Sequence, residues 1–280
     1  MDRQLRPART VGVEAAARAA LEARAGGEPV VVVARCDAAA DGRRLLVHPD
    51  ATRGTLGHPV LDAAGAALGR ELLGSGGPHP VRREVPAAGA ALYAELHRRP
   101  PRLLIVGAGH IALPLARIGV ELGFPVVVLD DREEFATADR FPDASAVRRV
   151  DFADPFRDTA IRDDDSVVLV TRAHRYDFDC LHRLLGGPVR PRYLGMVGSR
   201  RRIRAAFRAL LDAGMATEDL SAVHAPIGVS IGAETPEEIA VSIAAELVAV
   251  RRGAMARGSL RDVERIVERF LRAGGEGGGR

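Results

Sequence analysis

The stretch RLLIVGAGHIA, residues 102–112, decides the fold of this 280-residue chain. An apolar run leads into Gly107, Ala108, Gly109, His110, Ile111 and Ala112, a G-x-G-x-x-A turn. Gly107 permits the tight turn, Gly109 lets the backbone approach a pyrophosphate, and Ala112 allows a helix to pack closely on a strand. The stretch therefore predicts a strand, a glycine turn and a helix N-terminus whose free N–H groups favour an anion.

The residues that follow extend this nucleotide-binding pattern. The next predicted strand, residues 125–130, ends at Asp130, 23 residues after Gly107 and close to the ~20 expected for an acid that binds ribose hydroxyls. Asp131 and Arg132 come next, and Arg132 is placed to receive the 2′-phosphate of NADP. We expect a dinucleotide or a similar phosphate ligand here. The alternative is a glycine-rich turn in a degenerate domain that binds nothing.

Five predicted strands lie in the C-terminal part of the chain, most of them separated by helical segments. They cover residues 102–106, 125–130, 146–149, 166–170 and 193–197. Such alternation implies right-handed crossovers and a doubly wound parallel sheet of the Rossmann type. A last strong helix is predicted over residues 235–252, where Thr235, Pro236 and Glu238 form a capping box with proline at the first helical position.

The N-terminal part has a different pattern. It predicts helices at 11–25 and 90–97, strands at 30–35 and 43–48, and a turn followed by a helix over 54–73. The proline-rich RRPPR segment, residues 98–102, is typical of a linker. The expected fold class is therefore α/β. It comprises a smaller N-terminal domain at 1–98, a Rossmann-like domain at 99–253, and a C-terminal helix with a flexible tail at 254–280.

Composition excludes several kinds of chemistry. All 40 basic residues are arginine, so there is no Walker A lysine and no lysine that forms a Schiff base. Only Cys36 and Cys180 are present, too few for a four-cysteine zinc site. A net charge of +3 argues against a nucleic-acid binder. With neither a signal peptide nor an apolar membrane span, we expect a cytoplasmic protein.

Two polar clusters follow predicted strands. Thr171, Arg172, His174 and Asp177 come after the strand at 166–170, at the sheet edge where ligands bind. His174 and Asp177 are three residues apart, which suits a proton-transfer pair or two metal ligands, whereas the alternative is a helix cap with a solvated histidine. The second cluster is Gly198, Ser199 and Arg200 with the two arginines that follow. There a serine cap and arginine side chains favour a bound anion over a plain basic first turn.

Five ordered motifs together resemble the XdhC/CoxI family. They are IVGAGHIALPLA, VVVLDDREEFATADRFP, VTRAHRYD, YLGMVGSRRR and HAPIGVSIGAETPEEIAVSIAAELVAVRRG, within about residues 102–253. The resemblance implies a Rossmann domain and an accessory role for a molybdenum hydroxylase such as xanthine dehydrogenase. Family members are held to bind molybdenum cofactor (molybdopterin) as cargo, protect it during sulfuration, and pass it to the client enzyme. A cysteine desulfurase partner is implied, and a homodimer is one further expectation.

The N-terminal half departs from the family pattern. The family's small domain usually has a G-x-x-x-G-G-C segment, whereas residues 54–60 here read GTLGHPV and contain no cysteine. In the carrier interpretation, the glycine turn holds a phosphate, Arg200 and Arg201 supply charge, and His174, Asp177 and Glu234 line the cleft. Two alternatives stay open. One is an NAD(P)-dependent oxidoreductase in which His174 is the acid or base. The other is a nucleotide-binding sensor or scaffold without catalysis.

Overall fold

The computed structural model describes residues 10–75, 80–254 and 258–261. The chain forms two compact units, Met1–Pro100 and Pro101–Arg280, and the boundary between them falls within the RRPPR segment. Most of the predicted C-terminal helix and tail lies outside the described residues. No helix within the described ranges is long and apolar enough to cross a lipid bilayer.

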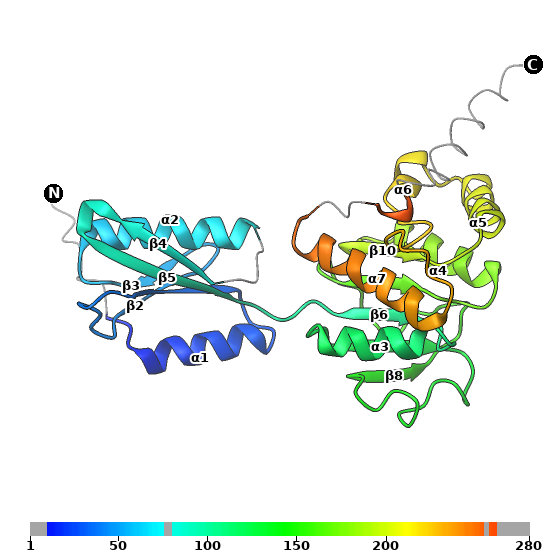
Figure 1. Cartoon of the computed structure of the whole chain (residues 1–280), viewed down its shortest axis with the longest axis horizontal. Coiled ribbons are helices and arrows are strands. Elements are labelled where there is room, and N and C mark those ends of the chain that lie inside the picture. The colour runs from blue at the N-terminus through cyan, green and yellow to red at the C-terminus, as the bar shows by residue number, and fades with distance from the viewer. Residues whose placement is uncertain (1–9, 76–79, 255–257, 262–280) are drawn as a thin grey trace, which may run out of the picture. The chain divides into compact units, whose positions relative to one another are not determined.

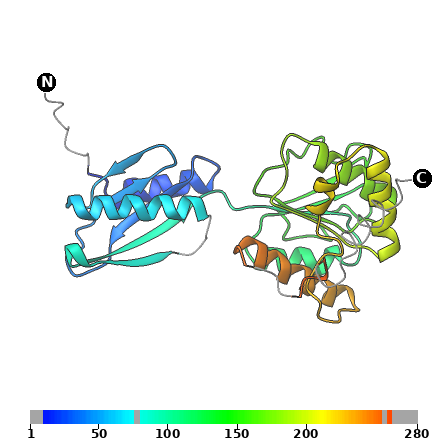
Figure 2. The same cartoon turned by 90° about the horizontal axis from the view of Figure 1, so that it is seen from above.

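The N-terminal unit is an antiparallel sheet with one helix on each face (Figure 1). Its strands, in the order β3-β2-β1-β5-β4, are β1 (Val30–Arg35), β2 (Arg44–Val47), β3 (Thr52–Gly54), β4 (Val81–Val85) and β5 (Ala90–His97), with a 3-10 turn η1 (Pro86–Ala88) before β5. Figure 2 shows α2 (Pro59–Ser75) in front of this sheet and α1 (Val13–Arg24) behind it. Val31 and Val33 pack on the α2 side, while Val30 and Val32 pack on the α1 side, as strand alternation requires.

The predicted helix at 90–97 is wrong, because this segment is strand β5. Its alanine, leucine and glutamate residues favour a helix in isolation. In the folded unit it pairs with β1 on one side, in the register Val30↔His97, and with β4 on the other, in the register Val81↔Ala94. Its position between two partner strands, with Ala91, Leu92 and Ala94 buried, overrides the local preference. Strands β3 and β4 are also absent from the sequence prediction.

The C-terminal unit confirms the predicted parallel sheet. Its strands, in the order β10-β9-β6-β7-β8, are β6 (Leu103–Val106), β7 (Val126–Asp130), β8 (Ala146–Arg149), β9 (Ser166–Leu169) and β10 (Tyr193–Met196). Every pairing between neighbours is parallel. The chain starts at the central strand β6, builds outward through β7 and β8, and then returns to add β9 and β10. The order reverses between β6 and β9, which is where ligands bind in open α/β sheets.

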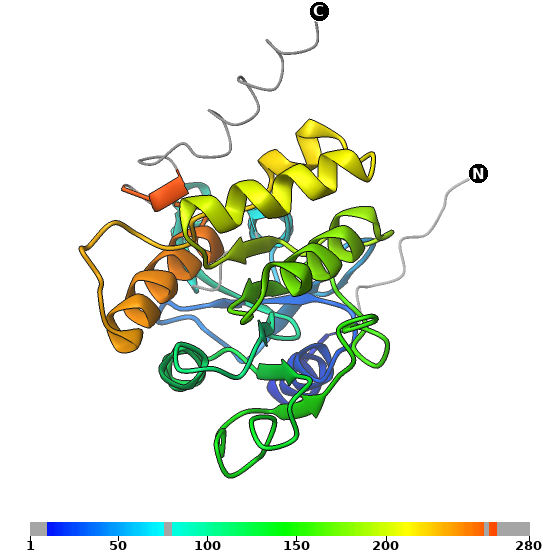
Figure 3. The same ribbon diagram turned by 90° about the vertical axis from the view of Figure 1, so that its right-hand side faces the viewer.

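Helices cover both faces of this sheet, as Figure 3 shows with the sheet between two pairs of helices. One face carries α3 (Ala112–Glu121) and α7 (Pro236–Arg251), and the other carries α4 (His174–Gly186) and α5 (Arg200–Asp212), with the short α6 (Thr217–Ser221) after α5. The predicted capping box of α7 is confirmed, since Thr235 Oγ1 accepts a hydrogen bond from the Glu238 N–H and the Glu238 carboxylate accepts one from the Thr235 N–H. Both α3 and α4 begin at the sheet edge beside the reversal point.

Candidate functional site

The glycine turn after β6 has the geometry that its sequence predicts. Gly107 has a φ of 106°, and a Cβ atom built on it would lie 2.6 Å from the carbonyl oxygen of Val170. Only glycine satisfies both constraints, so the turn is held tightly against the end of β9. A Cβ built on Gly109 would have no atom within 4 Å, and Ala112 is fully buried. The backbone at Gly109 is therefore open to a ligand.

Asp130, the predicted ribose-binding acid, is committed to contacts within the protein. Its Oδ1 accepts hydrogen bonds from the Arg132 N–H and Nε, both at 2.9 Å. Its Oδ2 accepts from the Ala108 N–H at 2.6 Å and from Arg132 Nη2 at 2.9 Å. Although burial alone raises the pKa of this carboxyl, the hydrogen bonds from Arg132 and Ala108 lower it to about 2. Asp130 thus fastens the glycine turn to the end of β7 as a carboxylate.

Asp131 and Arg172 join the ends of β7 and β9, the two strands that flank β6. Arg172 donates from Nη1 and Nη2 to the two carboxylate oxygens of Asp131 at 2.5 and 2.7 Å. The Tyr176 hydroxyl accepts hydrogen bonds from Arg172 and from Arg175. Because β6 lies between β7 and β9, this ion pair connects the loops on the two sides of the glycine turn. Arg172, predicted to lie at the ligand-binding edge of the sheet, is paired there with an acid.

Arg140 lies beside the glycine turn, and the sequence did not single it out. Its Nη2 donates to the carbonyl oxygen of Ala108 at 3.2 Å, inside the glycine turn. This guanidinium and that of Arg132 both lie over the ring of Phe135, at 4.7 and 3.5 Å from the ring centroid. The FATADRF segment was part of a quoted motif, yet nothing in its spacing indicated that residue 140 returns to the turn.

Asp177 contacts Thr171 and Arg202 rather than His174. The carboxylate is fully buried, and it accepts hydrogen bonds from Thr171 Oγ1 and Arg202 Nε, both at 2.6 Å. Burial raises the pKa of Asp177 above its ordinary value, despite the opposing effect of these two donors. His174 is exposed at the start of α4. The arrangement supports a structural anchor between β9 and α5 more than a proton-transfer pair.

The second predicted cluster lies at the start of α5. Ser199 caps the helix, because its hydroxyl accepts a hydrogen bond from the Arg202 N–H. Arg200 and Arg201 are exposed in the first turn, and Gly198 precedes them. Within the described residues, no group of three or more histidine, cysteine or acidic side chains is placed to hold a metal ion.

Glu246, a buried acid on α7, fixes the loop that precedes this helix. Its carboxylate accepts hydrogen bonds from the Tyr193 hydroxyl, the Gly228 N–H and the Ser259 hydroxyl. These donors, together with His224, lower the pKa of Glu246 against the effect of burial. Glu246 gives no signal in the sequence, because it lies within a helix of ordinary pattern. Glu234 is an exposed acid of the loop just before α7, and it lies outside this network.

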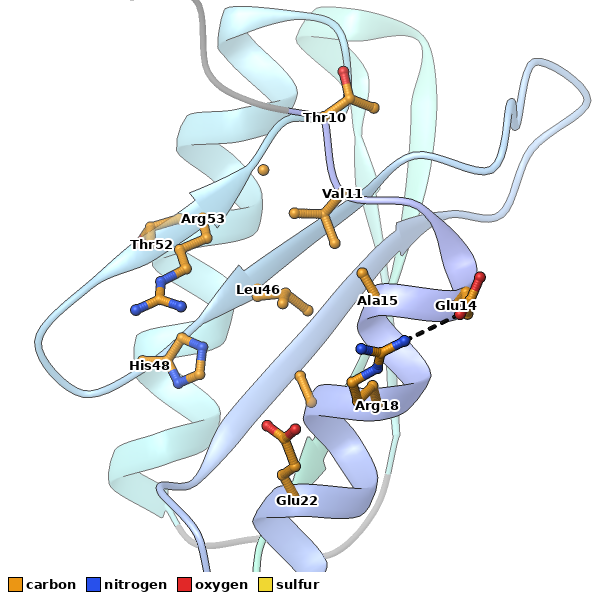
Figure 4. A pocket seen from close by; sticks show the side chains of 12 residues that line it. Thr10, Val11, Glu14, Ala15, Arg18, Glu22, Leu46, His48, Thr52 and Arg53 are labelled. Carbon is orange, nitrogen blue, oxygen red and sulfur yellow. Dashed lines mark hydrogen bonds and ion pairs between the residues drawn. The ribbon is translucent and has the colours of Figure 1, made fainter.

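A groove of about 780 Å³ lies in the N-terminal unit. Figure 4 shows it between α1 and the strands β2 and β3, with Arg18 paired to Glu14 along the helix. His48 and Arg53 line the opposite side. The mixed signs of these side chains give the groove no single charge preference.

Comparisons with known proteins agree with the C-terminal architecture. A family profile described as the XdhC Rossmann domain matches residues 103–247, just over half of the chain. The uncharacterized protein YqeB of Escherichia coli K12 is 33% identical over 165 residues, which cover 59% of this chain and 30% of YqeB. A Bacillus subtilis protein, named as a probable xanthine dehydrogenase subunit, is 30% identical over 152 residues, which cover 54% of this chain and 43% of that protein.

A solved structure described as a xanthine dehydrogenase from Bacillus halodurans has a TM-score of 0.65 and 26% identity to this chain. The match covers 90% of this chain and 68% of that one, so it extends into the N-terminal unit. The chain matches less than half the length of the two curated relatives. The glycine turn, the parallel sheet order and the matching family profile lead to one conclusion: this chain belongs to the XdhC family.

Proposed function

We propose that this protein is an accessory factor in the maturation of a molybdenum hydroxylase of the xanthine dehydrogenase type. In this role it binds the molybdenum cofactor as cargo, shields it during sulfuration, and delivers it to the client enzyme. The observation that carries the proposal is the glycine turn at residues 107–109, which is open at Gly109 and lies inside the domain matched by the XdhC profile. The names of two relatives, one of them a solved structure, supply the client class.

The cargo is anionic, because its pterin carries a phosphate, and the crevice has groups that suit such an anion. The glycine turn leads into the N-terminus of α3, where no side chain among the described residues caps the helix and the helix dipole favours negative charge. Arg140 lies beside the same turn, and no carboxylate partner for it lies within the described ranges. Arginine stays charged at any physiological pH and can bind phosphate through two N–H groups. We therefore place the phosphate between Gly109 and Arg140.

Sulfuration of the bound cofactor is assigned to a partner rather than to this chain. Cys180 is fully buried in α4, and burial raises the pKa of its thiol well above the ordinary value. Cys36 belongs to the N-terminal unit and follows β1. Neither position corresponds to the cysteine of the family's small domain. A cysteine desulfurase is the class of enzyme that would supply the sulfur, and this chain would hold the cofactor in a non-catalytic role.

The test is maturation of a xanthine dehydrogenase-type client with and without this protein. We expect client produced without it to contain little active cofactor, and client produced with it to recover hydroxylase activity. Gly109→Ala should reduce that recovery, because the added methyl group fills the approach to the turn. Gly186→Ala is the matched control, since its Cβ also meets no atom within 4 Å and lies away from the turn. Full client activity without this protein would contradict the proposal.

A further inference from the structure

We propose that Arg132 is a specificity-determining residue, which closes the ribose-diol site of this Rossmann domain and so selects against NAD. This inference rests on the proposed function, since it concerns the same crevice and its phosphate-bearing ligand. It assigns the ligand to one chemical class: phosphate esters that present no ribose diol to the end of β7. We call the group of Asp130, Arg132 and Phe135 the lock.

The carboxylate of Asp130 has no acceptor site left for a ribose. A carboxylate offers about four lone-pair positions. Arg132 fills three of them through its N–H, Nε and Nη2, and the Ala108 N–H fills the fourth. In dinucleotide-binding domains the acid at this position instead accepts the 2′-hydroxyl of the ribose. A ribose diol can reach Asp130 here only by displacing the charged guanidinium of Arg132, which donates through both Nε and Nη2.

The lock is built from one short segment of the chain, residues 130–135. Arg132 follows Asp130 by two residues, so its backbone N–H and its guanidinium reach the same carboxylate. The guanidinium also lies 3.5 Å from the centroid of the Phe135 ring. Asp130 is 1% exposed, which strengthens its attraction to the cation. Arg132 is consequently neutralised and is not available for the 2′-phosphate of NADP either.

A second ion pair lies at the same edge of the sheet. Arg172 and Asp131 join the loops after β9 and β7 across the end of β6. In a dinucleotide-binding domain the ligand lies in the crevice beyond these carboxyl ends. Both acids at the end of β7, Asp130 and Asp131, are therefore paired with arginine side chains. The glycine turn itself is left open at Gly109.

The experiment is calorimetric titration of the full-length protein with NAD⁺ and with inorganic pyrophosphate as separate probes. Wild-type protein should bind pyrophosphate, and its affinity for NAD⁺ should be no higher than its affinity for pyrophosphate. Arg132→Ala should gain at least about tenfold in NAD⁺ affinity, because the freed Asp130 accepts the ribose hydroxyls, while pyrophosphate affinity changes by less than about threefold. Arg132→Gln keeps a long side chain over Phe135 without the two-pronged clamp, and it should show the same direction of change.

Arg149→Ala is the matched control, because this exposed arginine at the end of β8 pairs only with exposed Glu133 among the described residues. Its NAD⁺ affinity should equal that of the wild type. Tight NAD⁺ binding by the wild type, or unchanged NAD⁺ affinity in both folded Arg132 variants, would overturn the inference. Failure to bind pyrophosphate would overturn the phosphate assignment. If the protein showed this ligand selectivity but did not support maturation of the client enzyme, only the proposed function would be contradicted.

Discussion

Arg202 and Asp177 form an ion pair that ties the start of α5 to the first turn of α4, with Arg202 Nε 2.6 Å from Asp177 Oδ2. Arg202 Nη2 also donates to the carbonyl and hydroxyl oxygens of Thr171, just beyond β9. The pair holds together two neighbouring loops at the ligand-binding edge of the sheet. Arg202, the last arginine of the cluster predicted to favour a bound anion, therefore has a structural task.

Arg202→Ala should lower the free energy of unfolding by about 3–5 kcal/mol, because it leaves the buried Asp177 carboxylate without its cation. The pKa of Asp177 is already raised and should rise further in this variant. A carboxyl with a raised folded-state pKa loses stability as the pH increases from its unfolded value through its folded value. The loss in free energy of unfolding caused by Arg202→Ala should thus be larger at pH 7 than at pH 4. Urea unfolding at both pH values measures it, with exposed Arg201→Ala as the control.

Asp130 should give the opposite pH dependence. Its pKa is lowered from 3.8 to about 2 in the folded protein, so its contribution to stability is complete above about pH 4. That contribution is lost as the pH falls from about 4 to about 2. Asp130→Asn should flatten the stability profile in this window, as measured by unfolding at several pH values. A profile as steep as that of the wild type would show that other acids are responsible.

The two glycines of the turn should separate folding from binding. Gly107→Ala should lower the free energy of unfolding by about 1–3 kcal/mol, because the residue has a positive φ and its Cβ would meet the Val170 carbonyl. Gly109→Ala should change it by less than about 0.5 kcal/mol, since its Cβ meets nothing. Only Gly109→Ala should reduce pyrophosphate affinity while leaving stability intact. Equal stability losses in the two variants would argue against this assignment of roles.

Glu246→Ala should loosen the loop before α7, because it leaves the buried Tyr193 hydroxyl and Gly228 N–H without an acceptor. Each unsatisfied group costs about 1–3 kcal/mol, so we expect a loss of at least about 2 kcal/mol in unfolding free energy. Hydrogen exchange at Gly228 should accelerate. Glu237→Ala, an exposed acid in the first turn of the same helix, provides the comparison. Unchanged exchange at Gly228 would show that the loop is held by other contacts.

The Rossmann unit was predictable because its signals are local. Apolar strands, the glycine turn and the α7 capping box each lie within a few residues, and the structure has them where the sequence predicts. Strand β5 was not predictable from AALYAELH, since its conformation depends on pairing with β1 and β4. The partner of Asp177 was missed for a similar reason. Arg202 is 25 positions away, and only the fold brings the two together.

The candidate site, too, was predictable where its signals are local and unpredictable where its contacts depend on the fold. The positions of Gly107, Asp130 and Thr171 at the sheet edge follow from strand ends, and the structure places them there. What Asp130 and Arg172 contact depends on side-chain geometry, which spacing does not encode. The sequence suggested ligand contacts for both residues, whereas the structure pairs them with Arg132 and Asp131. Arg140 and Glu246 gave no local signal at all.

The most direct test of the carrier role is to identify the small molecule that native protein releases on acid denaturation. The protein should be purified from cells that make molybdenum cofactor and then analysed by mass spectrometry and ultraviolet absorption. We predict a phosphorylated pterin in the released fraction, reduced in Gly109→Ala and unchanged in Gly186→Ala. Release of NAD or NADP, or of no pterin from protein that is folded and made alongside its client, would contradict the account.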